Sequence, residues 1–310
     1  MESRMESAKF RNGIIVLFLM IGVNLFAGPL AAAEDGKPTS DEIAKELANP
    51  NTALTSLKLQ TQYFSFDGDL SGADGQDMVK LFLQPTLPFP LENGKTVWVR
   101  PGLPFIIDKP VFETDSRQLG SESGLGDITL DVQYGTTLEN GFLWSVGFSS
   151  LFPTASKQKL GSGYWALGPG FQLGRVSEKS VFGVFANHQW DIAGDGRSSH
   201  ELPFPFFRQG ASSESGISLT AIQLFGVVLP GDGLSFGSTP IMTYNHQSSD
   251  WMIPLHLMLG KTFIINDRPC DFSVDVNYYV ERPDAIAPEW MVSFNVAPVV
   301  ENIFAKWFKD

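Results

Sequence analysis

The feature that most constrains this chain is a strict alternation of apolar and polar residues, repeated over most of its length. In "CDFSVDVNYYVE", residues 270–281, the even positions from Phe272 to Tyr278 are all apolar or aromatic, and the odd positions from Asp271 to Asn277 are all polar. Successive side chains of a β-strand point to opposite faces of a sheet, so a period of two predicts strands with one apolar face. The chain is therefore expected to be all-β.

Twelve segments follow this pattern, and most are about nine residues or longer, which is the length of a strand that crosses a bilayer. Short turns and mostly longer polar loops alternate between them, as in a barrel whose turns face the periplasm and whose loops face outward. We therefore predict a twelve-stranded antiparallel up-and-down transmembrane β-barrel over residues 55–299. The predicted strands are 55–66, 77–87, 96–107, 124–138, 142–152, 163–175, 180–191, 216–228, 234–245, 251–262, 270–281 and 289–299.

The alternation alone leaves open which face points inward, since a soluble ligand-binding barrel would carry its apolar face inside. The opposite face here is rich in glycine, serine, asparagine and glutamine, which favours a crowded polar lumen over contact with bulk water. Six tryptophans near strand ends favour an aromatic girdle at the two membrane interfaces. They are Trp98, Trp144, Trp165, Trp190, Trp251 and Trp290.

The N-terminus reads as a secretory signal, because a basic head and an uncharged run end at Ala31–Ala33. We predict a signal peptide over residues 1–33, the alternative being an uncleaved anchor. Residues 34–54 are expected to be an N-terminal periplasmic segment with a short helix near 39–48, which either plugs the lumen or hangs in the periplasm. Residues 300–310 follow the last strand as a C-terminal tail.

The net charge of the chain limits the kinds of partner that it can bind. The formal net charge of −12 argues against nucleic acid, because phosphate backbones are bound by clusters of Lys and Arg. The pattern predicts the bacterial outer membrane as the location. The expected partners are the lipid bilayer around the apolar face, a small-molecule solute and the outer-membrane assembly machinery.

The resemblance of several motifs to a known family agrees with this prediction. The stretch "LFPTASKQKLGSGYWALGPGF" (151–171), "LANP" (47–50), "GLGD" (124–127) and "WMIPLHLMLGK" (251–261) resemble the bacterial outer-membrane transporters named phenol-degradation meta-pathway proteins, some of which carry the label neuromedin U. The resemblance implies an outer-membrane barrel and, by association only, uptake of small aromatic compounds.

Charged residues on the polar parity are the candidate lumen-lining groups. Two interpretations stay open: a transverse field that orients polar solutes, or ion pairs that fill a narrow barrel. The candidates are Lys58, Lys80 and Arg100 on the first three strands, Asp127 and Asp131 on the fourth, and Asp271 and Asp275 on the eleventh.

No catalytic constellation stands out in the sequence. The four histidines have no zinc-type spacing, and neither a nucleophile elbow nor a phosphate-binding loop occurs. We therefore predict no enzyme activity and no cofactor. The expected function is passive passage of a small solute, apolar or aromatic in character, and the alternatives are a structural or adhesive barrel without transport and a soluble ligand-binding barrel.

Overall fold

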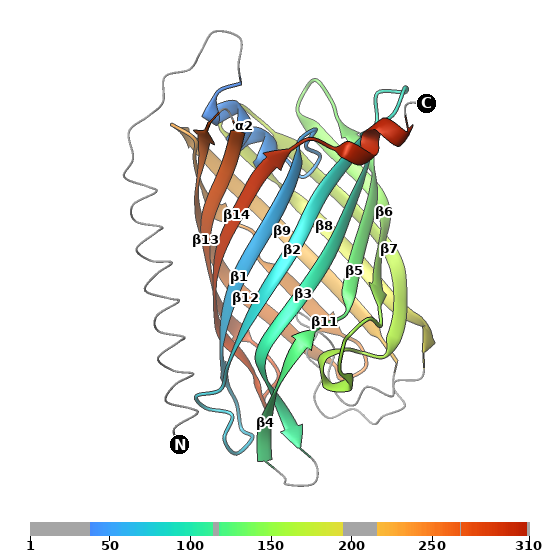
Figure 1. Ribbon diagram of the computed structural model, residues 1–310, viewed down its shortest axis with the longest axis vertical. Helices are drawn as coiled ribbons and strands as arrows, with labels where there is room; N and C mark the ends of the chain where they lie inside the picture. The colour runs from blue at the N-terminus through green and yellow to red at the C-terminus, as the bar shows by residue number, and fades with distance from the viewer. Residues whose placement is uncertain (1–37, 114–117, 195–215, 267, 309–310) are drawn as a thin grey trace. The chain divides into compact units, whose positions relative to one another are not determined.

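The computed structural model describes residues 38–113, 118–194, 216–266 and 268–308, and the described residues from Ser40 onward form one compact unit, a closed β-barrel (Figure 1). The predicted signal peptide lies outside the described residues. One α-helix, α2 (Ser40–Ala48), precedes the barrel as predicted. The strands are β1 (Thr55–Asp67), β2 (Asp77–Pro90), β3 (Thr96–Glu113), β4 (Gln118–Leu125), β5 (Ile128–Thr137), β6 (Phe142–Phe152), β7 (Tyr164–Val176), β8 (Ser180–Gly194), β9 (Ser218–Gly231), β10 (Leu234–Ser238), β11 (Ile241–Asn245), β12 (Asp250–Ile265), β13 (Arg268–Glu281) and β14 (Ala287–Val300).

The predicted twelve-stranded antiparallel barrel is confirmed. Two of its strands are interrupted: β4 and β5 both pair with β3, and β10 and β11 both pair with β9 and β12, so the 14 segments occupy 14 − 2 = 12 positions. The pairing of β1 with β14 and of β12 with β13 closes the ring of strands, and β4 lies off this ring with β3 as its one partner among the described strands. Short 3₁₀ helices lie at η1 (Gln158–Leu160) and η2 (Ile303–Phe308).

One predicted loop, residues 108–123, is wrong. β3 continues to Glu113 and pairs with β4, so this region forms a hairpin that reaches past the other strand ends (Figure 1). Residues 110–113 are "PVFE", and the apolar Val111 is 2% exposed. Burial of this β-branched side chain favours continuation of the strand through these residues.

The two faces of the barrel have opposite chemistry. On β12 the outward Leu255 and Leu257 are 63% and 61% exposed, whereas inward polar side chains such as Gln133 and Ser293 are 1% and 0% exposed. An exposed apolar belt around a barrel is stable only in contact with lipid, because each exposed leucine would otherwise face water. The polar groups point inward, where they hydrogen-bond to one another.

The glycines on the inner face of β7 are explained by close approach of the neighbouring strand. A Cβ at Gly168 would lie 1.6 Å from the carbonyl oxygen of His188 on β8, so only glycine fits there. Small residues on this face therefore serve the curvature of the wall, in addition to the lumen space expected from the sequence.

The described helices include none with the length and apolar character needed to cross a bilayer.

Candidate functional site in the lumen

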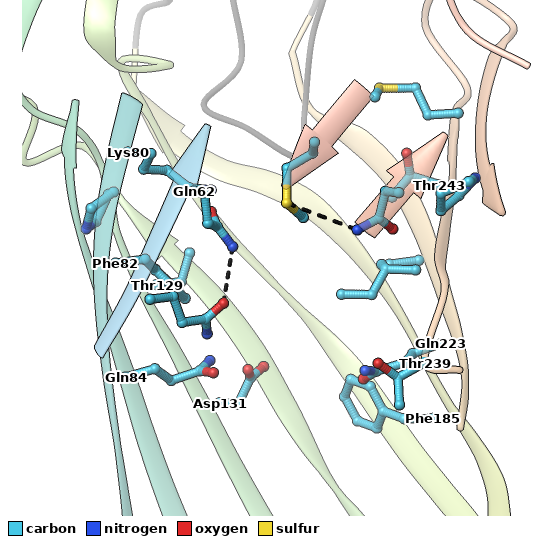
Figure 2. Close-up of a pocket in the computed structure, with 18 of the residues that line it drawn as sticks. Gln62, Lys80, Phe82, Gln84, Thr129, Asp131, Phe185, Gln223, Thr239 and Thr243 are labelled. Carbon is cyan, nitrogen blue, oxygen red and sulfur yellow. Dashed lines mark hydrogen bonds between the residues drawn. The ribbon is translucent and has the colours of Figure 1, made fainter. Parts of the chain in front are cut away.

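A cavity of about 330 Å³ lies in the middle of the lumen. Figure 2 shows its two walls: Gln62, Lys80, Phe82 and Gln84 with Thr129 and Asp131 on one side, and Phe185, Gln223, Thr239 and Thr243 on the other. The first wall comes from β1, β2 and β5, and the second from β8 to β11. Side-chain amides and two phenyl rings form part of the surface between them, beside several charged side chains. Such a lining offers neutral hydrogen bonds together with apolar contact.

The structure places the seven predicted lumen residues on the inner wall, but not all at the cavity. The five that line the cavity are Lys58, Lys80, Asp127, Asp131 and Asp275. Arg100 and Asp271 lie nearer the end with the short turns, where Asp271 accepts a hydrogen bond of 2.9 Å from the Thr262 hydroxyl.

Acidic and basic side chains lie next to each other on the inner surface, instead of on opposite walls of the lumen. Arg100 and Asp131 are directly opposite each other on β3 and β5 and interact electrostatically. Lys58 interacts with Asp271, which lies two strands away across β14. This arrangement argues against a transverse field, because adjacent opposite charges largely cancel at a distance. The second wall, from β8 to β11, contributes no charged residue to the described cavity lining.

Lys80 lies at the loop end of the cavity, 4% exposed. Its ammonium nitrogen is 5.5 Å from the centroid of the Phe64 ring and 5.2 Å from that of Phe82. Both distances fall within the range of a cation–π contact. The lysine is therefore held against two rings at the edge of the space that a solute would occupy.

Asp127 organises a loop as well as lining the cavity. Its carboxylate accepts hydrogen bonds from the Ala155 amide at 3.0 Å and from the Ser162 amide and hydroxyl at 2.6 and 2.8 Å. It sits at the break between β4 and β5, where the ladder with β3 is interrupted. Asp127, which was predicted to line the lumen, thus also holds the 153–162 loop in place at the loop end of the barrel.

An apolar cluster closes over the cavity at the loop end. Leu70, Ala73, Leu160 and Ile286 come from three loops and pack on strand residues. Met252, Tyr279 and Met291 belong both to this cluster and to the cavity lining. The other strand members are Phe64, Phe66, Met78 and Ile106.

The N-terminal segment enters the opposite end of the lumen. α2 packs against β9 and β12, with Ala44 buried against Val227 and Leu229. The Asp41 carboxylate accepts a hydrogen bond from the amide of Gly233, whose φ of 71° belongs to the β9–β10 turn. Of the two alternatives left open by the sequence, plug or free periplasmic segment, these contacts favour the plug, because the segment packs on inward side chains of the barrel.

Residues after the helix fix this segment to the wall. The Asn51 side chain donates hydrogen bonds to the carbonyl oxygens of Thr136 (3.0 Å) and Trp144 (3.1 Å), and accepts one from the Gln172 amide at 3.4 Å. The Arg100 guanidinium donates to the Pro50 carbonyl. Asn51 and Gln172 are not among the predicted site residues, although an asparagine in "ANPNT" and a glutamine among glycines were the available signals.

The prediction that Trp98 belongs to the aromatic girdle is wrong. Its side chain is 1% exposed, and its indole nitrogen donates a hydrogen bond of 2.7 Å to the carbonyl of Thr52. Trp98 shares the inward parity of Arg100, so the indole supports the N-terminal segment instead of facing lipid.

The other five tryptophans lie on the outward parity of their strands. Trp165, Trp190, Trp251 and Trp290 are 39–49% exposed, and Trp144 is half-buried beside Tyr134. Trp190 contacts His188 and Trp251 contacts Tyr244, at centroid distances of 4.3 and 4.8 Å. Their position is compatible with interface anchoring, which stays a prediction.

The described residues contain no group of three or more His, Cys, Asp or Glu side chains arranged to hold a metal ion. The predictions of no cofactor and no enzyme activity stay predictions.

Comparison with known proteins gives a fold but not a family. No family model matches the chain. No curated protein matches it either. Among solved structures, it is similar to the COG4313 outer membrane channel from Pseudomonas putida F1, with a TM-score of 0.59, 16% identity, and 80% of this chain and 95% of that one covered.

Two further solved structures are less similar to this chain, and nothing is inferred from them. The NanC porin has a TM-score of 0.47 at 10% identity, covering 79% of this chain and 99% of that one. The TodX monoaromatic hydrocarbon channel, a deltaS2 mutant, has a TM-score of 0.36 at 10% identity, covering 82% and 92%. The fold is thus that of a bacterial outer-membrane, channel-like β-barrel, which agrees with the predicted location and its lipid surroundings.

Proposed function

We propose that this barrel lets small, weakly polar aromatic solutes diffuse across the outer membrane. The observation that carries the proposal is the lumen cavity between the apolar cluster and the N-terminal segment. Its volume of about 330 Å³ is at the lower end of small-molecule pockets, so it suits a solute with one or two rings.

The residues that line the cavity determine which solutes it can bind. Phe82 and Phe185 face the cavity from opposite walls (Figure 2), so an aromatic ring can pack against either of them. Gln84, Gln223 and Asn187 offer neutral donors and acceptors to a hydroxyl or carbonyl group. Since Arg100 lies beside Asp131 and Lys58 interacts with Asp271, these charges do not require a charged solute to balance them.

Entry would pass the apolar cluster at the loop end. Met252 and Met291 lie in both the cluster and the cavity lining, and methionine side chains repack readily because they are unbranched and flexible. Passage is then diffusion down a concentration gradient, with the cavity as an intermediate stop.

A structural or adhesive barrel without transport is the second candidate. The apolar cluster and the N-terminal segment occupy the two ends of the lumen, and this favours a closed barrel. The two candidates differ in whether any solute crosses.

Uptake of radiolabelled 4-hydroxybenzyl alcohol by a porin-deficient Gram-negative strain tests the proposal. Cells with the barrel should take up the solute faster than cells without it. The Phe82→Ala/Phe185→Ala variant should lose most of that gain, whereas Phe171→Ala/Phe182→Ala, which removes outward rings that are 49% and 51% exposed, should keep it. Uptake equal to that of empty cells, from a barrel shown to be inserted, would refute transport and leave the second candidate.

A further inference from the structure

Three polar side chains meet on the outer face of the barrel near its loop end. His188 and Thr220 are direct cross-strand partners on β8 and β9, and His246 lies in the turn between β11 and β12. The Nδ1 atom of His188 lies 2.7 Å from the Thr220 hydroxyl oxygen, and the Nε2 atom of His246 lies 2.9 Å from the same oxygen. We call these three residues the histidine site.

The register places the histidine site on the side of the wall that faces away from the cavity. Asn187 lines the cavity, so the next residue of the strand, His188, points outward, and its cross-strand partner Thr220 shares that face. His246 is exposed, and its backbone amide donates to the Ser218 carbonyl at 2.9 Å, which holds the turn against β9. The histidine site is therefore separate from the solute path.

The spacing of the three atoms is close to that of neighbouring ligands around a metal ion. Bonds of about 2.0–2.1 Å that meet at about 90–109° separate two ligand atoms by about 2.9–3.4 Å, and the two distances to the Thr220 oxygen lie near the lower limit. The ring centroids of His188 and His246 are 5.0 Å apart. Two imidazoles on one tetrahedral ion have centroids about 5 Å apart, so small adjustments bring both nitrogens onto a common ion.

Hydrogen bonds alone give the Thr220 hydroxyl opposite roles at the two rings. A hydroxyl has one hydrogen, so it donates to one imidazole and accepts from the N–H group of the other. A cation instead needs a lone pair from each ring nitrogen. Both rings offer one when the donating ring carries its proton on its other nitrogen, and neutral imidazole is a preferred ligand of zinc and copper.

Aromatic side chains pack against both imidazoles. Trp190 contacts His188 at a centroid distance of 4.3 Å, and Tyr244 contacts His246 at 4.7 Å. Tyr244 in turn contacts Trp251 at 4.8 Å. Rings that are already held by packing lose less freedom when they bind an ion, which favours binding.

We propose that the histidine site binds a divalent late first-row cation, zinc or copper(II), on the outer face of the barrel. The two imidazole nitrogens are the main ligands, the Thr220 oxygen is a third, and water completes the coordination. No third His, Cys, Asp or Glu completes a group in the described residues, so binding is reversible. A bound ion joins β8, β9 and the β11–β12 turn, and this role is independent of the proposed transport.

Titration of the detergent-solubilised barrel with Zn²⁺, after purification without a histidine tag, tests the site. His200 lies outside the described residues and is replaced by alanine throughout. The test variants His188→Gln and His246→Gln keep a hydrogen-bonding side chain but remove the imidazole. The matched control is His256→Gln, which removes a histidine that lines the cavity on the inner face of β12. Heat-modifiable migration on gels verifies that each variant is folded.

The folded barrel should bind one Zn²⁺ at the histidine site, and each test variant should bind it at least about tenfold more weakly, while the control binds it as before. The electron paramagnetic resonance spectrum with one equivalent of Cu²⁺ should show coupling to two nitrogens, and to one in either test variant. Absence of zinc binding by the folded barrel, or binding that either test substitution leaves unchanged, overturns the proposal. Neither result bears on the proposed transport, which solute uptake tests separately.

Discussion

Replacement of Asn51 by alanine should release the N-terminal segment from the lumen. The side chain is 7% exposed and makes two hydrogen bonds of 3.0 and 3.1 Å to carbonyl oxygens and a longer one with Gln172. Alanine leaves these buried partners unsatisfied, which costs about 1–2 kcal/mol in the docked state. A loss of that size raises the undocked fraction by roughly 5–30-fold.

Hydrogen–deuterium exchange of the α2 amides measures that fraction, because these amides exchange when the segment undocks. We expect α2 exchange to accelerate about tenfold in Asn51→Ala, with the amides of β6 and β7 unchanged. Asn51→Asp should accelerate it further, since a carboxylate would face two carbonyl oxygens. The matched control is Asn93→Ala, which removes an exposed contact with Tyr134 in the β2–β3 turn. Wild-type exchange rates in Asn51→Ala would refute the assignment of Asn51 as the anchor.

Three further predictions follow from single contacts. Trp98→Phe removes the donor to the Thr52 carbonyl and should accelerate hydrogen exchange of the α2 amides several-fold while the barrel still inserts. Exchange rates equal to those of wild type would mean that Trp98 contributes by packing and not by this hydrogen bond. Asp127→Ala removes three hydrogen bonds from the 153–162 loop and should expose that loop to limited proteolysis, whereas Glu122→Ala, which breaks only an exposed ion pair with Lys157, should not. At the loop end, the hydrogen bond with Asp74 and, after it, the Gly68 amide and Arg282 hold the pKa of Asp67 below its ordinary value, so the Asp67–Arg282 pair (2.6 Å) should persist above the ordinary carboxyl pKa and be lost as the pH falls through the lowered one; the protection factors of the 67–76 amides, which correct for the slower intrinsic exchange in acid, should fall on acidification, and constant protection factors would contradict this.

Much of the barrel could be predicted because a period of two survives in most of the described strands. The predicted segment 142–152 coincides with β6, and 251–262 falls within β12, since alternation fixes which residues face lipid. Strand breaks were not predictable in the same way. The β10–β11 and β4–β5 interruptions arise from cross-strand pairing, which one strand's pattern does not encode.

The site was harder to predict than the fold. Inward parity placed Lys80 and Asp131 on the lumen wall, but parity does not say which neighbour neutralises a charge, so Arg100 beside Asp131 emerged only with the register. Trp98 was assigned to the girdle from its place near a strand end, although its parity pointed inward. The plug contacts of Asn51 join residues about 85–121 positions apart, a separation that no local pattern reveals.

The central claim is that lipid covers the apolar face of the barrel and the polar face encloses the solute path. Spin labels placed singly at positions 255 to 260 of β12, in reconstituted bilayers, test it most directly. We predict high collision rates with oxygen and low rates with a water-soluble nickel chelate at Leu255, Leu257 and Leu259, and the reverse ratio or full burial at His256, Met258 and Gly260. Equal nickel accessibility at all six positions, or an inverted alternation, would contradict the account.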